Sequence, residues 1–219
     1  MNRLFGVFLF LLVWVEICLG GIPEPPNLGI LKKTIRNYIE SGSYDKDIEL
    51  VVNKAIHYVY DRYDDVVNPA AVFDIDETAL SNIEYEYKYD FGFSYDTWVE
   101  WVKQSRAKAI KPTLKLYRIC QQFKVQTFFI TGRNQLNENL SEDPTVVNLK
   151  NEGYFGWKRI YFKPIGSKMT TIEYKSKCRK EIEENGYKII INIGDQWSDL
   201  EGGYSEQIYK LPNPMYYIP

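Results

Sequence analysis

A small set of aspartates, one threonine and one lysine are the side chains in this 219-residue sequence whose types and spacing suit chemistry. They lie in four short segments: Asp74-Ile75-Asp76, Thr131-Gly132, Lys175, and Gly194 to Asp199, which contains Asp195 and Asp199. So many carboxylates repel one another unless a cation is present, and an all-oxygen set of this kind suits Mg²⁺. Lys175 could neutralise a phosphate and a nucleophilic carboxylate together, while Thr131 and the backbone N–H groups beside Gly132 could bind phosphoryl oxygens. The set predicts phosphate chemistry.

The elements that must position these residues alternate along the chain. Four apolar runs predict buried strands at residues 70–75, 125–130, 160–162 and 187–193. Between them, apolar spacing and capping residues predict helices over 48–63 with Asp45 as its cap, over 114–123, from Asp143-Pro144 onward, and over 171–185 closed by Gly186. This alternation predicts an α/β fold with a parallel sheet covered by helices on both faces, which binds ligands at the carboxyl ends of its strands. Residues two apart point the same way there, so Asp74 and Asp76 face one substrate while Ile75 packs inward.

Two segments fall outside this alternation. Residues 79–111 are rich in Tyr, Phe and Trp, and we interpret them as a small inserted lid. The rings are either the lid's own small core or a stacking surface for an aromatic leaving group. Residues 21–30 are loop-like, with three prolines between Ile22 and Asn27. The length of the chain allows one well-buried domain, predicted at 21–219, with the lid as an appendage.

The N-terminus predicts export. Arg3 precedes an apolar run from Leu4 to Val15, and the small residues Gly20 and Gly21 follow, so residues 1–20 are predicted to be a cleaved signal peptide. The alternatives are a retained anchor, a first core helix or, less favoured, a lipid anchor on Cys18. The run is shorter than the ~20 residues of a typical membrane span. We therefore expect a secreted or periplasmic protein with no stable membrane anchor after cleavage.

Composition narrows the class of protein further. With 27 basic and 29 acidic side chains the formal charge is −2, so no basic field would hold a nucleic-acid polymer. The single histidine, His57, excludes mechanisms that need several imidazoles and is expected at the surface or in packing. Cys120 and Cys178 are expected to be buried free thiols, with a disulfide between them as the less favoured alternative.

The ordered motifs resemble the haloacid dehalogenase (HAD) superfamily of phosphotransferases. The matching residues are Val72 to Thr78, Phe128 to Thr131, Lys175, and Gly194-Asp195 through Asp199. Within the superfamily, Tyr174 to Arg179, the run 194–199 and the ending 210–217 are similar to the secreted acid phosphatases (class B, subfamily IIIB), a branch that includes plant vegetative storage proteins. The resemblance covers about residues 25–217. It implies a Rossmann-like three-layer α/β/α sheet of the HAD type, with the aromatic-rich helical insert after the first motif strand.

The resemblance also implies a mechanism. Asp74 would attack phosphorus to form an aspartyl-phosphate, and Asp76 would protonate the leaving alcohol and then activate water, so an acidic activity optimum is expected. Mg²⁺ would be held by Asp74, Asp195 and the backbone carbonyl of Asp76. Asp199 would reach the metal through water or orient Lys175. The substrate would be a small phosphomonoester, with nucleoside monophosphates as a candidate class. The alternatives are a storage or binding protein on this fold with low activity, and a phosphotransferase to alcohols.

The roles of two arginines stay open at this point. Arg133 follows Gly132, and Arg179 lies four residues after Lys175. Each is expected to brace a loop, pair with a carboxylate or contact the substrate.

Overall fold

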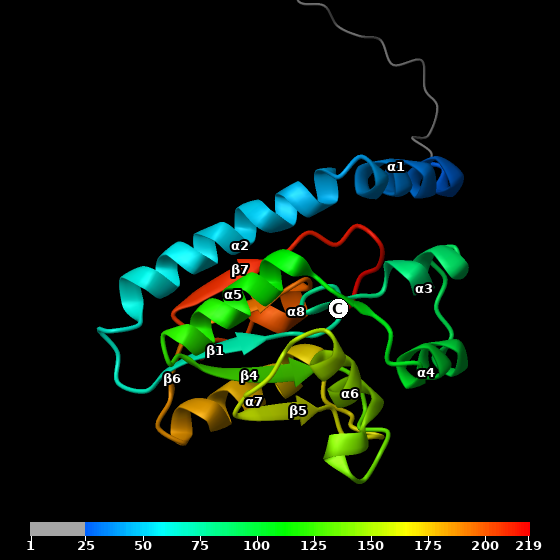
Figure 1. Cartoon of the computed structure of the whole chain (residues 1–219). Helices are drawn as coiled ribbons and strands as arrows, with labels where there is room; N and C mark the ends of the chain where they lie inside the picture. The colour runs from blue at the N-terminus through cyan, green and yellow to red at the C-terminus, as the bar shows by residue number, and fades with distance from the viewer. Residues whose placement is uncertain (1–24) are drawn as a thin grey trace, which may run out of the picture.

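A five-stranded parallel sheet forms the centre of the protein, with the strand order β5-β4-β1-β6-β7 (Figure 1). The computed structural model describes residues 25–219, so the predicted signal peptide lies outside the described residues. The strands are β1 (Pro69–Phe73), β4 (Gln126–Thr131), β5 (Arg159–Phe162), β6 (Lys188–Gly194) and β7 (Gln207–Lys210). Because β4 and β6 flank β1, the segments that follow these three strands meet at one edge of the sheet. The four predicted strands are confirmed. The short β7 was not anticipated.

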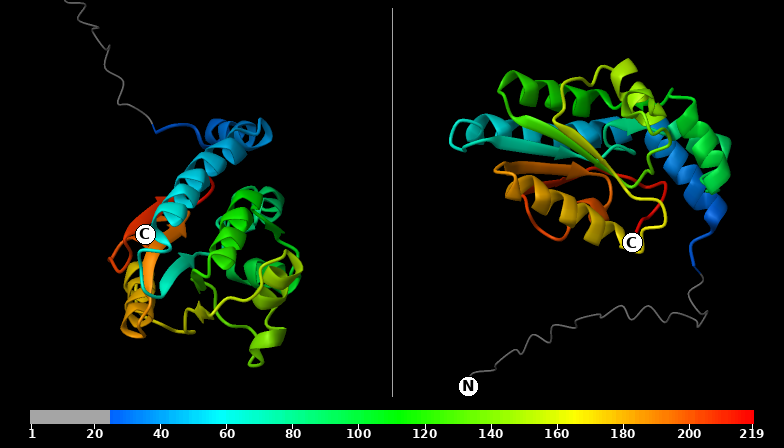
Figure 2. Two further views of the ribbon diagram at one scale, coloured as in Figure 1. Left: turned by 60° about the vertical axis from the view of Figure 1, so that its left-hand side comes forward. Right: turned by 90° about the horizontal axis from the view of Figure 1, so that it is seen from below.

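Helices cover both faces of the sheet, as the alternation predicted (Figure 2). The helices α2 (Ser43–Arg62) and α5 (Lys111–Gln122) pack together on one face, and α7 (Thr171–Glu184) packs on the other. The remaining helical elements are α1 (Leu28–Glu40), η1 (Leu140–Glu142), α6 (Pro144–Asn151) and α8 (Trp197–Leu200). The predicted three-layer α/β/α arrangement is therefore present.

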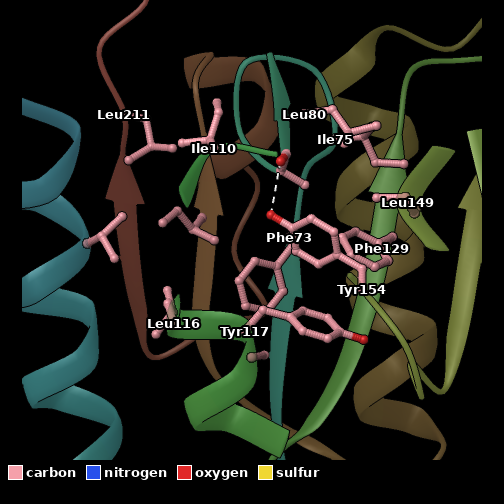
Figure 3. Packing of buried hydrophobic residues seen from close by; sticks show 14 of the residues in the cluster. Phe73, Ile75, Leu80, Ile110, Leu116, Tyr117, Phe129, Leu149, Tyr154 and Leu211 are labelled. Carbon is pink, nitrogen blue, oxygen red and sulfur yellow. Dashed lines mark hydrogen bonds between the residues drawn. The ribbon is translucent and has the colours of Figure 1, made fainter. Parts of the chain in front are cut away.

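The central strand β1 is buried on both sides. Its residues alternate between two hydrophobic clusters, with Ala71 and Phe73 facing the α2/α5 side and Ala70 and Val72 facing α7. Phe73 packs edge-on against Tyr117, which stacks on Phe129 at a centroid distance of 5.6 Å (Figure 3). This rigid aromatic packing fixes the end of β1, from which the acidic segment continues.

Some local predictions differ from the structure in their boundaries. The helix α2 begins at Ser43 after Gly42, so Asp45 lies in its first turn and does not cap it. The predicted loop at 21–30 is wrong at its end, because α1 starts at Leu28 with the Asn27 side chain accepting a hydrogen bond from Ile30. Asp143 does cap α6, since its carboxylate accepts from the Thr145 N–H at 2.9 Å.

The segment from β1 to α5 lies beyond the carboxyl ends of the strands (Figure 1). It contains β2 (Leu80–Ser81), α3 (Ile83–Lys88), α4 (Tyr95–Lys103) and β3 (Lys108–Ala109), with β2 and β3 antiparallel. The ring of Tyr85 packs against Tyr89 and Trp98, which gives this segment a small aromatic core of its own. Between residues 25 and 219, no helix is long and apolar enough to cross a membrane.

The cysteines at positions 120 and 178 and the single histidine all lie on helices. Cys120 on α5 and Cys178 on α7 are both free and buried, on opposite faces of the sheet, so the disulfide alternative is wrong. His57 is exposed on α2, as expected.

Candidate active site

The chain leaves β1 with two carboxylates that face one cavity. Asp74 and Asp76 both line a hollow of about 500 Å³ at the carboxyl ends of the strands. Between them, Ile75 is fully buried in the hydrophobic core. The backbone N–H of Asp74 donates to the carbonyl of Ile193 at 3.0 Å, which ties this segment to the end of β6. The spacing argument therefore describes the observed geometry.

Three buried aspartates and one lysine form the floor of this cavity. Carboxylate oxygens of Asp74, Asp195 and Asp199 all lie within 4.8 Å of one another. The Nζ of Lys175 donates to Asp74 and, at 2.6 Å, to the Oδ1 of Asp199. The structure thus brings four of the predicted site residues together, although they come from three segments separated by up to 125 residues (74 to 199).

The charges of this cluster are unbalanced. Burial raises the pKa of Asp74 well above its usual value; Lys175 opposes this, and the neighbouring carboxylates add to it. Burial also raises the pKa of Asp195 to about 7, with further contributions from Asp199 and Glu77. Although burial alone would lower it, the charges of Asp199 and Asp74 raise the pKa of Lys175. One ammonium cannot neutralise three carboxylates, and all the donor atoms are oxygen, so the site fits a hard divalent cation.

Asp199 is held in place by a close approach to Gly194. A Cβ added at Gly194 would lie 2.5 Å from the Cβ of Asp199 and 2.6 Å from its Oδ2. That Oδ2 accepts a hydrogen bond from the Gln196 N–H at 2.8 Å, while Oδ1 accepts from Lys175. Only glycine at position 194 leaves room for this arrangement.

The side chain of Asp76 has a different set of partners. Arg133 donates to it from Nη2 at 2.6 Å and from Nε at 3.1 Å, and the Nδ2 of Asn82 donates at 2.9 Å. The guanidinium carbon of Arg133 lies 5.3 Å from the ring centre of Trp98 on α4. The Asp76 carboxylate therefore stands apart from the aspartate cluster, and Arg133 pairs with a carboxylate.

The structure also places Arg179, whose role the sequence left open, and Gly132 and Thr131, which were predicted to bind phosphate. Arg179 donates to the backbone carbonyls of Gly203, Asp199 and Glu201, so it braces the loop after α8. Gly132 lines the cavity, whereas the buried Thr131 accepts a hydrogen bond from the Arg133 N–H at 3.1 Å.

Several polar residues around the site have hydrogen-bonding roles that were not predicted from the sequence. Gln196 and Asn213 each donate to the Oδ2 of Asp195 at 2.7 Å, and the Thr78 hydroxyl donates to its Oδ1 at 3.3 Å. Asn213 lies in the ending that carried the family resemblance, but no pattern indicates a contact across 18 residues.

Glu77 follows Asp76 in sequence but points elsewhere. Its backbone has a φ of +49°, and its carboxylate accepts hydrogen bonds from Asn82 and from the hydroxyl of Tyr216. Burial, followed by the charge of Asp76, raises the pKa of Glu77 to about 8, against the effect of these donors. Glu77 therefore joins the C-terminal tail to the start of the insert.

The wall of the cavity is mostly apolar and comes from the insert, the C-terminal tail and the segment after β4. Tyr95 of the insert also reaches the segment after β4, where its hydroxyl donates to Asn134 at 3.3 Å. The apolar lining side chains are Phe91, Phe93, Tyr95, Trp98, Val99, Val102, Leu136, Tyr216, Tyr217 and Ile218.

A comparison with models of protein families identifies the family of this chain. The family model described as HAD superfamily, subfamily IIIB (Acid phosphatase) matches residues 29–219. The chain is 37% identical over 197 residues to vegetative storage protein 1 of Arabidopsis thaliana, covering 86% of this chain and 70% of that protein. It is 35% identical to acid phosphatase 1 of Solanum lycopersicum, covering 84% and 73%. The class C acid phosphatase of Bacillus anthracis has a similar fold, with a TM-score of 0.70, 19% identity and 86% of each chain covered.

Proposed function

Since the chain belongs to the HAD superfamily, subfamily IIIB (Acid phosphatase), we propose that it is a magnesium-dependent acid phosphatase that hydrolyses phosphomonoesters through an aspartyl-phosphate on Asp74. The observation that carries this proposal is the contact of Lys175 with both Asp74 and Asp199 at the floor of a cavity of about 500 Å³. This contact holds a buried carboxylate at the point where a phosphate would enter.

The proposed reaction has two steps. An oxygen of Asp74 attacks phosphorus, the ester P–O bond breaks, and Asp76 gives its proton to the leaving alcohol oxygen. Water then attacks phosphorus and gives its proton to Asp76, and the P–O bond to Asp74 breaks to release phosphate. Lys175 offsets the negative charge of Asp74 and of the phosphate, and the backbone at Gly132 offers N–H groups to phosphoryl oxygens.

The proposed metal ligands are Asp74, Asp195 and the backbone carbonyl of Asp76. Asp199 accepts a hydrogen bond from the Nζ of Lys175 at 2.6 Å, which favours a role for Asp199 in orienting Lys175. Bound Mg²⁺ would offset the charge that keeps an anionic nucleophile from an anionic phosphate.

Trapping of the intermediate tests this proposal. Acid quenching during turnover of a radiolabelled phosphomonoester should leave label on the wild-type chain and none on Asp74→Asn. Asp76→Asn should still be labelled by an aryl ester, with turnover lowered by about 10²–10⁴ and more so for alkyl esters. Labelling or near-wild-type hydrolysis by a folded Asp74→Asn variant would refute the role of Asp74, and full activity after exhaustive chelation would refute the metal.

A storage protein on the same fold is the second candidate, because two relatives bear that name. The acidic pair Asp74 and Asp76 favours the enzyme, since a storage role does not need it. Kinetics on nucleoside monophosphates, sugar phosphates and aryl phosphates distinguish the two, and added alcohols would reveal phosphate transfer in place of hydrolysis.

We also propose that residues 79–111 act as a lid and that residues 1–20 direct export to a secreted or periplasmic location. The contact between Tyr95 and Asn134 supports the lid, because it joins the insert to the opposite wall of the cavity. Sequencing the N-terminus of the mature protein tests the cleavage.

A further inference from the structure

One carboxylate in the cavity has no role in the reaction proposed above. Glu86 lies on α3 of the insert and lines the cavity, with only 6% of its surface exposed. Its backbone is satisfied, because its N–H donates to the carbonyl of Asn82 and its carbonyl accepts from Phe91. Within residues 25–219, no hydrogen bond or ion pair reaches its carboxylate. The carboxylate oxygens of Glu86 are not fully enclosed, so a ligand that displaces water from the cavity can supply the missing hydrogen-bond partner.

The charged side chains at the reacting end of the cavity pair with one another and not with Glu86. The carboxylate of Asp76 is occupied by Arg133 and Asn82, and Asp74 and Asp199 share Lys175. Lys175 and Arg133 are therefore already engaged, while Lys163 lines the same cavity and no ion pair is recorded for it in the described part of the chain. Burial, and then the charge of Asp76, raises the pKa of Glu86 to about 7.

The cavity that Glu86 lines also has apolar side chains in its wall. Phe91, Trp98 and Val102 come from the insert, and Tyr216 from the C-terminal tail. An apolar body of the leaving group would lie against these rings, with the phosphate held at Asp74. Glu86 then offers a hydrogen-bond acceptor, and a negative charge when ionised, to whatever the leaving group carries.

The geometry points to Glu86 as a specificity residue that selects phosphomonoesters whose apolar leaving group carries a hydrogen-bond donor, an ammonium above all, and disfavours those with a second anion. This inference rests on the proposed phosphatase function and names the substrate class of that same site. An ammonium would pair with Glu86, and a hydroxyl would donate to it. A second carboxylate or phosphate would meet an uncompensated negative charge.

Four phenyl phosphates with similar leaving phenols test the inference, since they differ only in the para substituent. These substituents are aminoethyl, hydroxyethyl, ethyl and carboxyethyl, and kcat/KM is measured for each above pH 7. For the wild type, the aminoethyl ester should exceed the carboxyethyl ester by about tenfold or more, with the other two between them. The Glu86→Gln variant should bring that ratio towards one.

The same helix offers a matched control. Glu84 is largely exposed and pairs with Arg106 at the surface, so Glu84→Gln removes the same charge from α3 without changing the cavity and should keep the wild-type ratio. Glu86→Met provides a second cavity variant, with circular dichroism as the check on folding. A wild-type ratio near one, or an equal fall in the Glu84→Gln variant, overturns the inference.

Turnover and binding measurements together distinguish a failure of the proposed function from a failure of this inference. If no ester is hydrolysed by the wild type, the proposed function is wrong. Titration calorimetry of the same four esters with the Asp74→Asn variant still measures the preference, because binding needs no turnover. Equal dissociation constants for the aminoethyl and carboxyethyl esters then overturn the role of Glu86, and a tenfold difference that disappears in Asp74→Asn/Glu86→Gln supports it.

Discussion

The close approach of Gly194 to Asp199 makes the arrangement of the carboxylates sensitive to a single methyl group. In Gly194→Ala, the new Cβ would lie 2.5 Å from the Cβ of Asp199, which is about 1 Å inside normal contact. The Asp199 Cβ is fixed by its own backbone in α8, so the helix must move and the carboxylate moves with it. The hydrogen bonds of Asp199 with Lys175 and with the Gln196 N–H would then lengthen.

The size of the effect follows from these contacts. Overpacking of this kind costs about 1–3 kcal/mol. A weakened hydrogen bond to a charged group adds a cost of similar size, so a loss of about 3 kcal/mol is expected. For a chain of this length that corresponds to a melting temperature lower by about 6–12 °C. Because Lys175 also contacts Asp74, displacement by about 1 Å should lower kcat on the order of 10²-fold.

Thermal unfolding and steady-state kinetics on an aryl phosphate measure both effects. Gly132→Ala is the matched control for stability, since a Cβ there would meet nothing within 4 Å. Its unfolding free energy should stay within about 0.5 kcal/mol of the wild type. A Gly194→Ala variant with wild-type stability and wild-type kcat would refute the argument that this glycine makes room for Asp199.

Three further predictions concern other parts of the site and core. Asn213→Ala removes a donor to Asp195, and should raise the Mg²⁺ concentration needed for half-maximal activity by about 10–100-fold. In metal-free protein, Glu86 binds a proton more tightly when folded, with a pKa of about 7 against 4.5. Its stabilising contribution is full below pH 4.5 and lost as the pH rises through 7. In Glu86→Gln, the free energy of unfolding should therefore fall by about 2 kcal/mol less than in the wild type over this pH range. This figure is below the full linkage value because the cavity is open to solvent. The same pH dependence in both proteins would contradict the prediction. Cys120 and Cys178 should react with a thiol reagent only after unfolding, and fast reaction of native protein would contradict their burial.

The strands and the residues that end them could be predicted because their sequence requirements are local. The alternation of β1 between two buried faces requires a short apolar run, and the chain supplies one from Ala70 to Phe73. Asp143 precedes a proline at the first turn of α6, which is a local capping pattern. Asp45 shows the limit of such reasoning, because α2 starts two residues earlier at Ser43, after a glycine with positive φ.

The partners of the site residues could not be predicted, because they depend on contacts between distant segments. Asn213 reaches Asp195 only because β7 places the C-terminal tail beside β6. Tyr216 reaches Glu77 across 139 residues of sequence. The open cavity face of Glu86 likewise depends on how the insert lies against the tail, which the aromatic composition of residues 79–111 does not determine.

The hydrogen-bond partners of Asp74 and Asp76 bear on the different roles proposed for these two aspartates. Asp74 shares one ammonium with Asp199, whereas Asp76 receives a guanidinium and the amide of Asn82. A nucleophile must stay free to approach phosphorus, so a single compact cation at its side suits Asp74. An acid–base group must hold one orientation through both proton transfers, and donors from two segments fix the orientation of Asp76. The two contacts of Asp76 join the insert to the end of β4, so a shift of the insert would move the proton donor relative to the nucleophile.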